Sequence, residues 1–268
     1  MMAHLIFIEG VSGVGKTTTS TALAARLQGM GRPARCFLEG EPDNPLDLFY
    51  VAYLKPAQFD AMLRDHPDQA EGLREKSLVT PDCAFVRYRD SQNQALFLGE
   101  LHRFLEAHEF SYQPTQPQPQ AEFERIFLDR WARFAQREAS YDGYLIFDGA
   151  LFQHQINDLL RNYTAPTEQI ARHIGALVRA VAPLHPMLFY LSTQDVEGRL
   201  SWARMRRGQT PPTAEKVAHT KTRKTLDLAI FETLSCEAHA FDVDDRDIAD
   251  VIDEVTSYIA SPKREEIN

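Results

Sequence analysis

The chain has 268 residues, of which 44% are hydrophobic and 25% charged, as expected for a globular protein with a full core. Its formal net charge of −9 disfavours a surface that follows a nucleic-acid backbone, because such surfaces carry a basic excess. Three widely spaced cysteines form neither a metal spacing nor a disulfide framework. No apolar run approaches the length of a membrane span, and the N-terminus passes directly into the first expected strand. We therefore expect no membrane segment, no signal peptide and a cytoplasmic protein.

The first thirty residues contain a strand, a glycine-rich loop and a helix. The apolar run 5–8 predicts a buried strand, and residues 18–27 predict a helix that Gly29 ends. Between them, residues 10–17 read Gly-Val-Ser-Gly-Val-Gly-Lys-Thr, which matches the pattern G-x-x-x-x-G-K-[ST]. A chance glycine-rich turn is the alternative, but a strand before and a helix after are the context that a phosphate-binding loop requires.

This loop predicts a nucleoside triphosphate site. Glycines let backbone N–H groups turn inward around a phosphate, and the helix start adds further N–H groups and the positive end of its dipole. Lys16 is expected to reach the β- and γ-phosphates of ATP, and the Thr17 hydroxyl is expected to ligate Mg²⁺. The expected nucleotide-binding residues are Gly10, Ser12, Gly13, Val14, Gly15, Lys16, Thr17 and Thr18.

Further strands are expected along the chain, alternating with helical stretches. The runs are 34–38, 144–147 (ending at Asp148), 187–191 and 239–243, and an amphipathic helix over 248–259 follows. The alternation predicts an α/β fold, with a parallel sheet of about five strands flanked by helices.

About a hundred residues separate the second and third expected strands, too many for a plain crossover. Helices are predicted over 58–64, 94–106 and 122–138, and an exposed loop over the Pro/Gln-rich stretch 113–120. Few aliphatic residues are available for a separate core. We therefore expect one domain, 1–268, with a helical insertion over 46–125 that covers the functional edge of the sheet and shapes an acceptor pocket.

Carboxylates follow three of the expected strands. Asp148 stands at the carboxyl end of an apolar strand, where it could hold Mg²⁺ or accept a proton from an attacking hydroxyl. A turn aspartate before Gly149 is the alternative. Glu9 directly precedes the loop glycine and could touch the metal or the acceptor. Glu39 and Glu41 follow the second strand, where loop solvation is the competing interpretation.

An arginine-rich helix is predicted over 195–208, and it suggests a lid over 195–210. Guanidinium groups stabilise the charge of a transferring phosphoryl group, and a closing lid excludes water. A solvated surface helix is the alternative. The four candidates are Arg199, Arg204, Arg206 and Arg207, of which Arg204 and Arg207 are taken as catalytic.

Two further groups could contact the acceptor. Arg130 and Arg133 lie on the helix before the third strand, beside an apolar stripe, and an arginine there could bind an anionic acceptor or simply pair with Asp129 or Glu138. The residues after Asp148 that could line the pocket are Phe152, His154, Gln155 and Asn157.

The pattern resembles the nucleotide and nucleoside kinases of the P-loop superfamily, thymidylate kinase most of all. Residues 7–18, Phe-Ile-Glu-Gly-Val-Ser-Gly-Val-Gly-Lys-Thr-Thr, are similar to that family's first strand and loop, and Glu41-Pro42 is similar to its Glu-Pro pair. Asp148 falls where the family has an Asp-Arg pair, but Gly149 follows it here. The resemblance implies a P-loop NTPase fold and Mg²⁺-dependent transfer of the ATP γ-phosphate to a small acceptor.

We thus expect a phosphotransferase that uses ATP and Mg²⁺ and acts on a nucleotide, a nucleoside, or another alcohol such as a sugar or antibiotic. A nucleotide-controlled regulatory module without an acceptor is the alternative. Neither nucleic acid nor membrane is an expected partner, and a homodimer is left open.

Overall fold

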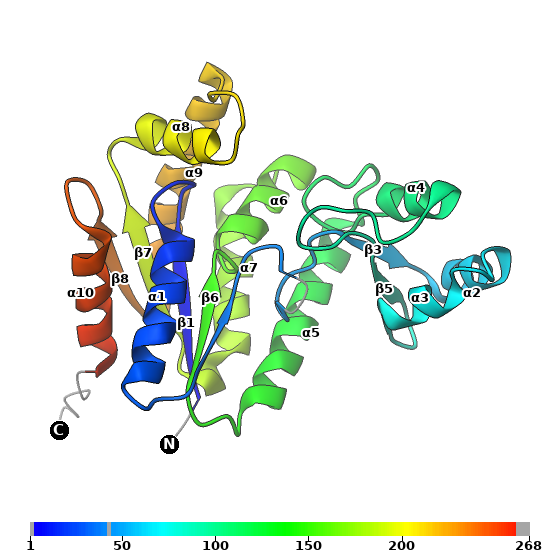
Figure 1. Cartoon of the computed structure of the whole chain (residues 1–268), viewed down its shortest axis with the longest axis horizontal. Coiled ribbons are helices and arrows are strands. Elements are labelled where there is room, and N and C mark those ends of the chain that lie inside the picture. Colours follow the sequence, from blue (N-terminus) through cyan, green and yellow to red (C-terminus); the bar gives the residue numbers. More distant parts are fainter. Residues whose placement is uncertain (1–2, 42–43, 261–268) are drawn as a thin grey trace.

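The described residues, 3–41 and 44–260, form a parallel sheet with helices on both faces in this computed structural model (Figure 1). Its five strands are β1 (His4–Gly10), β2 (Ala34–Phe37), β6 (Tyr144–Asp148), β7 (Met187–Ser192) and β8 (Glu237–Asp242). All neighbours pair in parallel, in the order β2-β6-β1-β7-β8. This order and direction confirm the α/β fold and the five-stranded sheet that the sequence predicts.

Alternation along each strand divides the apolar side chains between two cores, because successive strand side chains point to opposite faces. In β1, Leu5 and Phe7 belong to one buried cluster, whereas Ile6 and Ile8 belong to the other. The helices that cover these faces are α1 (Lys16–Gly29) and α10 (Ile248–Ala260) on the Ile6 side, and α5 (Gln120–Glu138) and α7 (Thr167–Ala180) on the Leu5 side.

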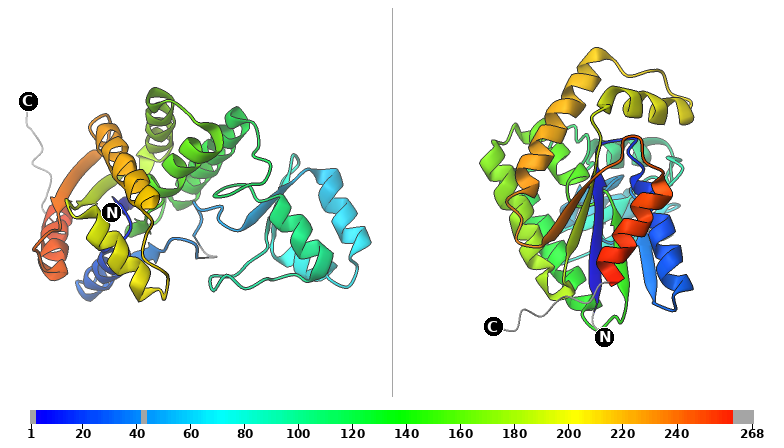
Figure 2. Two further views of the ribbon diagram at one scale, coloured as in Figure 1. Left: turned by 90° about the horizontal axis from the view of Figure 1, so that it is seen from above. Right: turned by 90° about the vertical axis from the view of Figure 1, so that its left-hand side faces the viewer.

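Three further helices lie near the edge where the strands end, as Figures 1 and 2 show. They are α6 (Gln153–Tyr163), α8 (Val196–Arg206) and α9 (Ala214–Phe231), while a short 3-10 turn, η1 (Ala182–Leu184), leads into β7. The arrangement brings the glycine-rich loop, the end of β6 and α8 to one side of the molecule.

The long segment between β2 and β6 stands beside the main sheet (Figure 2) and contains a second sheet. Its elements are β3 (Val51–Leu54), α2 (Pro56–Asp65), α3 (Ala70–Glu75), β4 (Ser77–Val79), β5 (Ala84–Arg87) and α4 (Gly99–Ala107). The three strands pair antiparallel in the order β3-β5-β4. The helical insertion expected from the sequence therefore also contains a three-stranded sheet.

Two sequence expectations for this segment are wrong. The segment does have a core of its own, built largely from aromatic and leucine side chains such as Leu73, Tyr88 and Leu101, all at most 1% exposed. The helix predicted over 94–106 begins only at Gly99, whose φ is 58°. Residues before it are held in a turn in which Asp90 Oδ1 accepts from the N–H groups of Gln92 and Gln94.

Within the described part of the chain, none of the helices combines the length and the apolar character that crossing a membrane would require.

Candidate active site

The glycine-rich loop joins β1 to α1 in a conformation that only glycine adopts readily. Gly13 has a φ of 93°, and a Cβ on it would lie 2.2 Å from the carbonyl oxygen of Arg199. Gly15, with a φ of 99°, caps the start of α1. Val14 is buried beneath the loop, Ser12 is half-buried, and Thr18 is exposed on the first turn of α1. The loop thus has the backbone form that a phosphate cradle needs.

Lys16, Thr17 and Asp148 meet beside this loop. The Lys16 ammonium donates to the carbonyl of Val11 at 3.3 Å, and the Thr17 hydroxyl donates to Asp148 Oδ2 at 2.5 Å. Asp148 is 2% exposed, and its Oδ1 has no hydrogen-bond partner among the described residues. Burial raises the pKa of Asp148, against the opposing effects of Lys16 and Thr17. The ends of β1 and β6 and the start of α1 thereby bring together the Lys16 ammonium, the Thr17 hydroxyl and the Asp148 carboxylate.

These groups fit a magnesium ion bound together with a nucleotide. Among the residues that the structure describes, one Asp148 oxygen has no hydrogen-bond partner, and the Thr17 hydroxyl lies against the other. Across residues 3–41 and 44–260, no three His, Cys, Asp or Glu side chains gather as a metal cluster. Mg²⁺ prefers one or two protein oxygens with the rest supplied by phosphates and water, so this sparse donor set suits it.

Glu9 lies under the site rather than open to it. Its side chain is fully buried, and its Oε1 accepts from the backbone N–H groups of Leu151 and Phe152 at 2.6 and 3.0 Å. Burial raises the pKa of Glu9 to about 7, although those hydrogen bonds and the charge of Lys16 oppose the shift. The carboxyl therefore fixes the turn that follows β6, a role that the sequence analysis did not predict.

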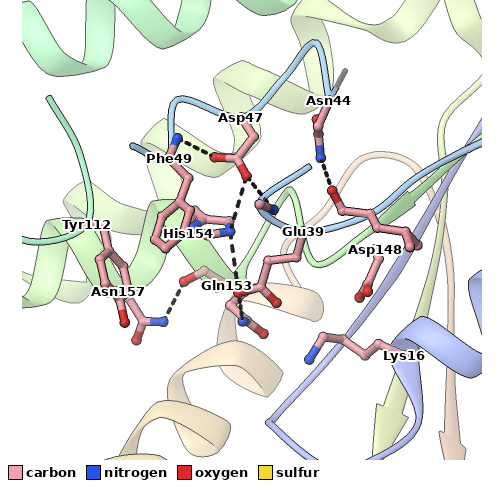
Figure 3. A network of polar contacts seen from close by, with 12 residues as sticks. Lys16, Glu39, Asn44, Asp47, Phe49, Tyr112, Asp148, Gln153, His154 and Asn157 are labelled. Carbon is pink, nitrogen blue, oxygen red and sulfur yellow. Dashed lines mark hydrogen bonds and ion pairs between the residues drawn. The ribbon is translucent and has the colours of Figure 1, made fainter. Parts of the chain in front are cut away.

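A second polar group continues from Lys16 and Asp148 along the start of α6 (Figure 3). Gln153 donates to Glu39 Oε1 at 2.6 Å, and His154 Nε2 lies 3.7 Å from Glu39 and 3.8 Å from Asp47. Burial alone would lower the pKa of His154, but the charges of Asp47 and Glu39 outweigh it and the pKa is raised. Glu39 thus lies between the phosphate loop and the pocket expected for an acceptor.

The other expected pocket residues divide into two sets. Asn157 lies beside Tyr112 in Figure 3, on the side of His154 away from Lys16. Phe152 is instead part of the main core, and Gln155 is 1% exposed with its Oε1 at 3.0 Å from His173 Nε2. Phe152 and Gln155 therefore face the interior, because helical residues one apart point in different directions.

The arginine-rich helix α8 is anchored at its start and exposed at its end. Arg199 donates to the carbonyl of Val243 at 2.6 Å and lies 3.6 Å from Asp244 Oδ1, in a hollow beside the loop. Arg204 donates to the carbonyl of Thr210 at 2.6 Å, and Arg206 stacks over Trp202. Arg207 is exposed. The catalytic roles of Arg204 and Arg207 remain predictions.

Arg130 and Glu41 lie apart from the group around Lys16. Arg130 donates to the carbonyl of Asp47 at 3.3 Å and lines a cavity between α5 and the β4–β5 connection. Burial lowers the pKa of Arg130 to about 10. Glu41 is half-buried in the loop after β2, and Pro42 lies outside the described residues. Arg133 pairs with Asp129, one of the two pairings expected as the alternative to acceptor binding. Substrate binding by Arg130 and Glu41 stays a prediction.

The sequence analysis missed a buried ion pair on α9. Arg223 is 5% exposed, pairs with Asp227, and donates to the carbonyl of Gln153 at 3.3 Å. Its charge also lowers the pKa of Glu9. The signal was present as an Arg–Asp pair four residues apart within a basic stretch, but such pairs are common on solvated helices. Only the packing of α9 shows that this pair is buried under the site.

The loop geometry and the strand order decide the fold. The chain has a P-loop NTPase fold. No protein-family model matches the chain, and no curated protein matches it. Among solved structures, it is similar to the YorR protein of Bacillus subtilis, which was crystallised in complex with phosphorylated GDP. That similarity has 10% identity over 95% of both chains and a TM-score of 0.45.

The P-loop chain is also similar to thymidylate kinase from Candida albicans, with 11% identity and a TM-score of 0.44. The match covers 96% of this chain and 91% of that one. At such identities a likeness carries no information about substrates. What this site binds must be argued from its own residues.

Proposed function

We propose that the chain is a phosphotransferase that uses ATP and Mg²⁺ and moves the γ-phosphate to a hydroxyl of a small molecule. The observation that carries the proposal is the contact of Thr17 with Asp148 at 2.5 Å, beside Lys16 and the loop glycines. Phosphoryl transfer needs positioning and charge stabilisation more than covalent chemistry, and these groups can supply both.

Each group has a separate part in the proposed reaction. The loop N–H groups and the Lys16 ammonium bind the phosphates of ATP, and Thr17 and Asp148 are the residues that would hold Mg²⁺. Bound Mg²⁺ would neutralise developing charge on the phosphates. The bond from the γ-phosphorus to ADP breaks, a bond to the acceptor oxygen forms, and the hydroxyl proton is released. In the proposed reaction, Asp148 Oδ1 or the neighbouring Glu39 accepts that proton.

The proposal also explains why a polar surface continues past Asp148. A hydrolase would need only water at this position, whereas the row from Glu39 to Asn157 offers hydrogen-bond partners to a larger molecule (Figure 3). An acceptor bound there would lie next to the phosphates held by the loop.

Acceptor-dependent turnover tests the proposal. Purified protein with ATP and Mg²⁺ should release ADP when given a suitable member of a panel of nucleosides, nucleoside monophosphates, sugars and amino sugars. Mass analysis should show that acceptor heavier by one phosphate. Lys16→Ala should abolish this transfer and keep the fold, whereas Lys76→Ala, which changes an exposed lysine, should retain it. ATP bound tightly and turned over by no acceptor would favour the regulatory module instead.

A further inference from the structure

The two carboxylate oxygens of Glu39 have different surroundings. Gln153 Nε2 donates to Oε1 at 2.6 Å, and His154 Nε2 lies 3.7 Å from the same oxygen. Oε2 has no hydrogen bond to a residue that the structure describes. The side chain is 36% exposed, whereas Asp148 is 2% exposed, and in Figure 3 it lies between His154 and Lys16. Glu39 is therefore anchored through one oxygen and leaves the other for a molecule bound beside the phosphate loop.

His154 stands between Glu39 and Asp47 at the start of α6 (Figure 3). It is 6% exposed, and its Nε2 lies 3.8 Å from Asp47 Oδ2 without a hydrogen-bond partner in the described part of the chain. Asp47 is itself fixed, because its oxygens accept from the N–H groups of Gly40 and Phe49 at 3.0 and 2.8 Å. Distances somewhat longer than a hydrogen bond are common at sites without substrate and shorten when it binds. One fixed carboxylate thus holds the imidazole against Glu39.

The charges around His154 favour its imidazolium form. Burial lowers the pKa of His154, but nearby carboxylates outweigh burial and raise it. These carboxylates come from the loop after β2, from α6, from β1 and from β6, and they are Asp47, Glu39, Asp158, Glu9 and Asp148. Burial raises the pKa of Asp158 to about 6 and that of its neighbour Glu109 to about 7, so both hold their protons more tightly than ordinary carboxyls. The charge on His154 therefore depends first on Asp47 and Glu39.

We propose that His154 is a positioning residue for the transfer: held by Asp47, its imidazolium fixes Glu39 so that Oε2 accepts the hydrogen bond of the acceptor hydroxyl. That hydrogen bond orients the hydroxyl oxygen toward the γ-phosphorus beside Lys16. Misplacing a reacting group by about 1 Å costs up to about 10²-fold in rate, so such an orientation is worth a large factor. His154 neither gains nor loses a proton, and the bonds formed and broken are those of the proposed phosphotransfer, on which this inference rests.

The ratio of wild-type to His154→Gln turnover, followed against pH, tests the role of the imidazolium. The acceptor is the panel member that supports ADP release, at saturating ATP and acceptor, between about pH 5.5 and about pH 9.5. We expect a ratio of roughly 10 at the acidic end. It should fall to about 1 as pH rises through the pKa of His154, because wild type then loses the charge that the variant lacks throughout. A ratio independent of pH would overturn the proposal, since lost packing alone acts at every pH.

The same comparison in a Glu39→Gln background tests whether His154 acts through Glu39. Because the Glu39 side chain is partly exposed, this variant should keep its fold and its ATP affinity. Its turnover should be at least about 10-fold lower than that of wild type, and adding His154→Gln should lower it no further. A further loss of the same size would show that His154 acts elsewhere. If His154→Gln does not fold, the profile of Glu39→Gln decides alone: it must lack the fall in turnover at the pKa of His154.

His66→Gln is the matched control, because His66 is half-buried at the end of α2 in the insertion. It should match wild type at every pH. The affinity for ATP, measured by calorimetry, should be the same in His154→Gln and wild type, because Lys16 and the loop are unchanged. Transfer to none of the panel members would overturn the proposed phosphotransfer, and the inference with it. Transfer with a ratio independent of pH would overturn the inference and leave the phosphotransferase standing.

Discussion

Asp148 differs from the other buried carboxylates because its partners belong to the phosphate site. Its Oδ2 accepts from Thr17, its Oδ1 is without a partner among the described residues, and Lys16 is the first of the charges that lower its pKa. A carboxylate needed only for a turn would instead bind backbone N–H groups, as Glu9 does.

We therefore expect Asp148→Asn to lower turnover about 10²- to 10⁴-fold, since the variant loses both a metal ligand charge and a proton acceptor. The affinity for ATP without Mg²⁺ should change little, because the Lys16 ammonium and the loop remain. Steady-state kinetics with calorimetric ATP binding measures both quantities. Asp60→Asn, on the exposed side of α2, serves as the control. Near-normal turnover of Asp148→Asn would remove Asp148 from the mechanism.

Glu9 gives a prediction about pH and stability. Burial raises its pKa from 4.5 in the unfolded chain to about 7 in the folded protein, so the folded state holds the proton more tightly between those values. The free energy of unfolding contributed by Glu9 is therefore present below pH 4.5 and is lost as pH rises through 7.

Glu9→Gln should remove this loss, because the amide oxygen can still accept from Leu151 and Phe152. Relative to wild type, the free energy of unfolding of the variant should rise between about pH 5 and pH 8, by at most about 3 kcal/mol. Denaturant titrations of both proteins at several pH values measure this difference in the free energy of unfolding. Glu109 and Asp158 contribute equally to both proteins, so their contributions cancel in the difference. Parallel curves for the two proteins would show that the folded pKa of Glu9 is not raised.

At the scale of elements, α8 and the phosphate loop pack as one unit. The backbone of Gly13 touches that of Arg199, and Arg199 in turn donates to Val243 beyond β8. A helix anchored this way cannot move its first turn without moving the loop. Movement is then restricted to the exposed end that carries Arg204, Arg206 and Arg207.

Gly13→Ala should disturb the packing of the phosphate loop against α8. The new Cβ would lie 2.2 Å from the Arg199 oxygen at a φ of 93°, so α8 must shift. Strain of about 1–3 kcal/mol is expected from the backbone alone. We expect a lower melting temperature and weaker ATP binding, both measurable by thermal denaturation with and without ATP.

Gly29→Ala is the matched control, because it ends α1 with open space around its Cα. It should stabilise by about 0.5–1 kcal/mol and leave ATP binding unchanged. ATP binding by Gly13→Ala equal to that of wild type would mean that the loop and α8 are not coupled.

The elements that carry the phosphate site were predictable because their signals are local. The run Leu-Ile-Phe-Ile, the loop pattern and the apolar strand ending at Asp148 each identify an element within ten residues. The small sheet of β3, β5 and β4 was not predictable from the sequence. Its strands have only three or four residues, and so short an alternation cannot be distinguished from a loop. Asp158 and Arg223 were missed for another reason. Their burial depends on which helix faces meet, and a single sequence does not show that.

At the scale of the molecule, the small sheet connects the insertion to the main core. Val51 and Tyr53 of β3 pack in the core shared with α5, whereas Ala52 and Leu54 pack in the insertion's own core. The helices α2, α3 and α4, which contribute to that second core, lie on the side of the insertion away from the main sheet (Figure 2). Tyr112 follows α4, whose residue Leu101 belongs to that second core, so the position of Tyr112 beside Asn157 depends on the insertion being folded (Figure 3).

This division predicts that damage to the outer core acts on the acceptor before it acts on ATP. Leu101 is fully buried, and Leu101→Ala should cost about 2–5 kcal/mol in a core of this kind. Because the main sheet has separate cores, hydrogen exchange should speed up across residues 51–107 while the amides of β1, β6 and β7 stay protected. ATP binding should persist, and transfer to the acceptor should fall.

Leu98→Ala, three residues earlier and 75% exposed, should leave exchange and transfer unchanged. Equal loss of protection in the central strands of Leu101→Ala would mean that the insertion and the sheet unfold together. In that case the alternating side chains of β3 would couple the two cores too tightly for the insertion to open alone.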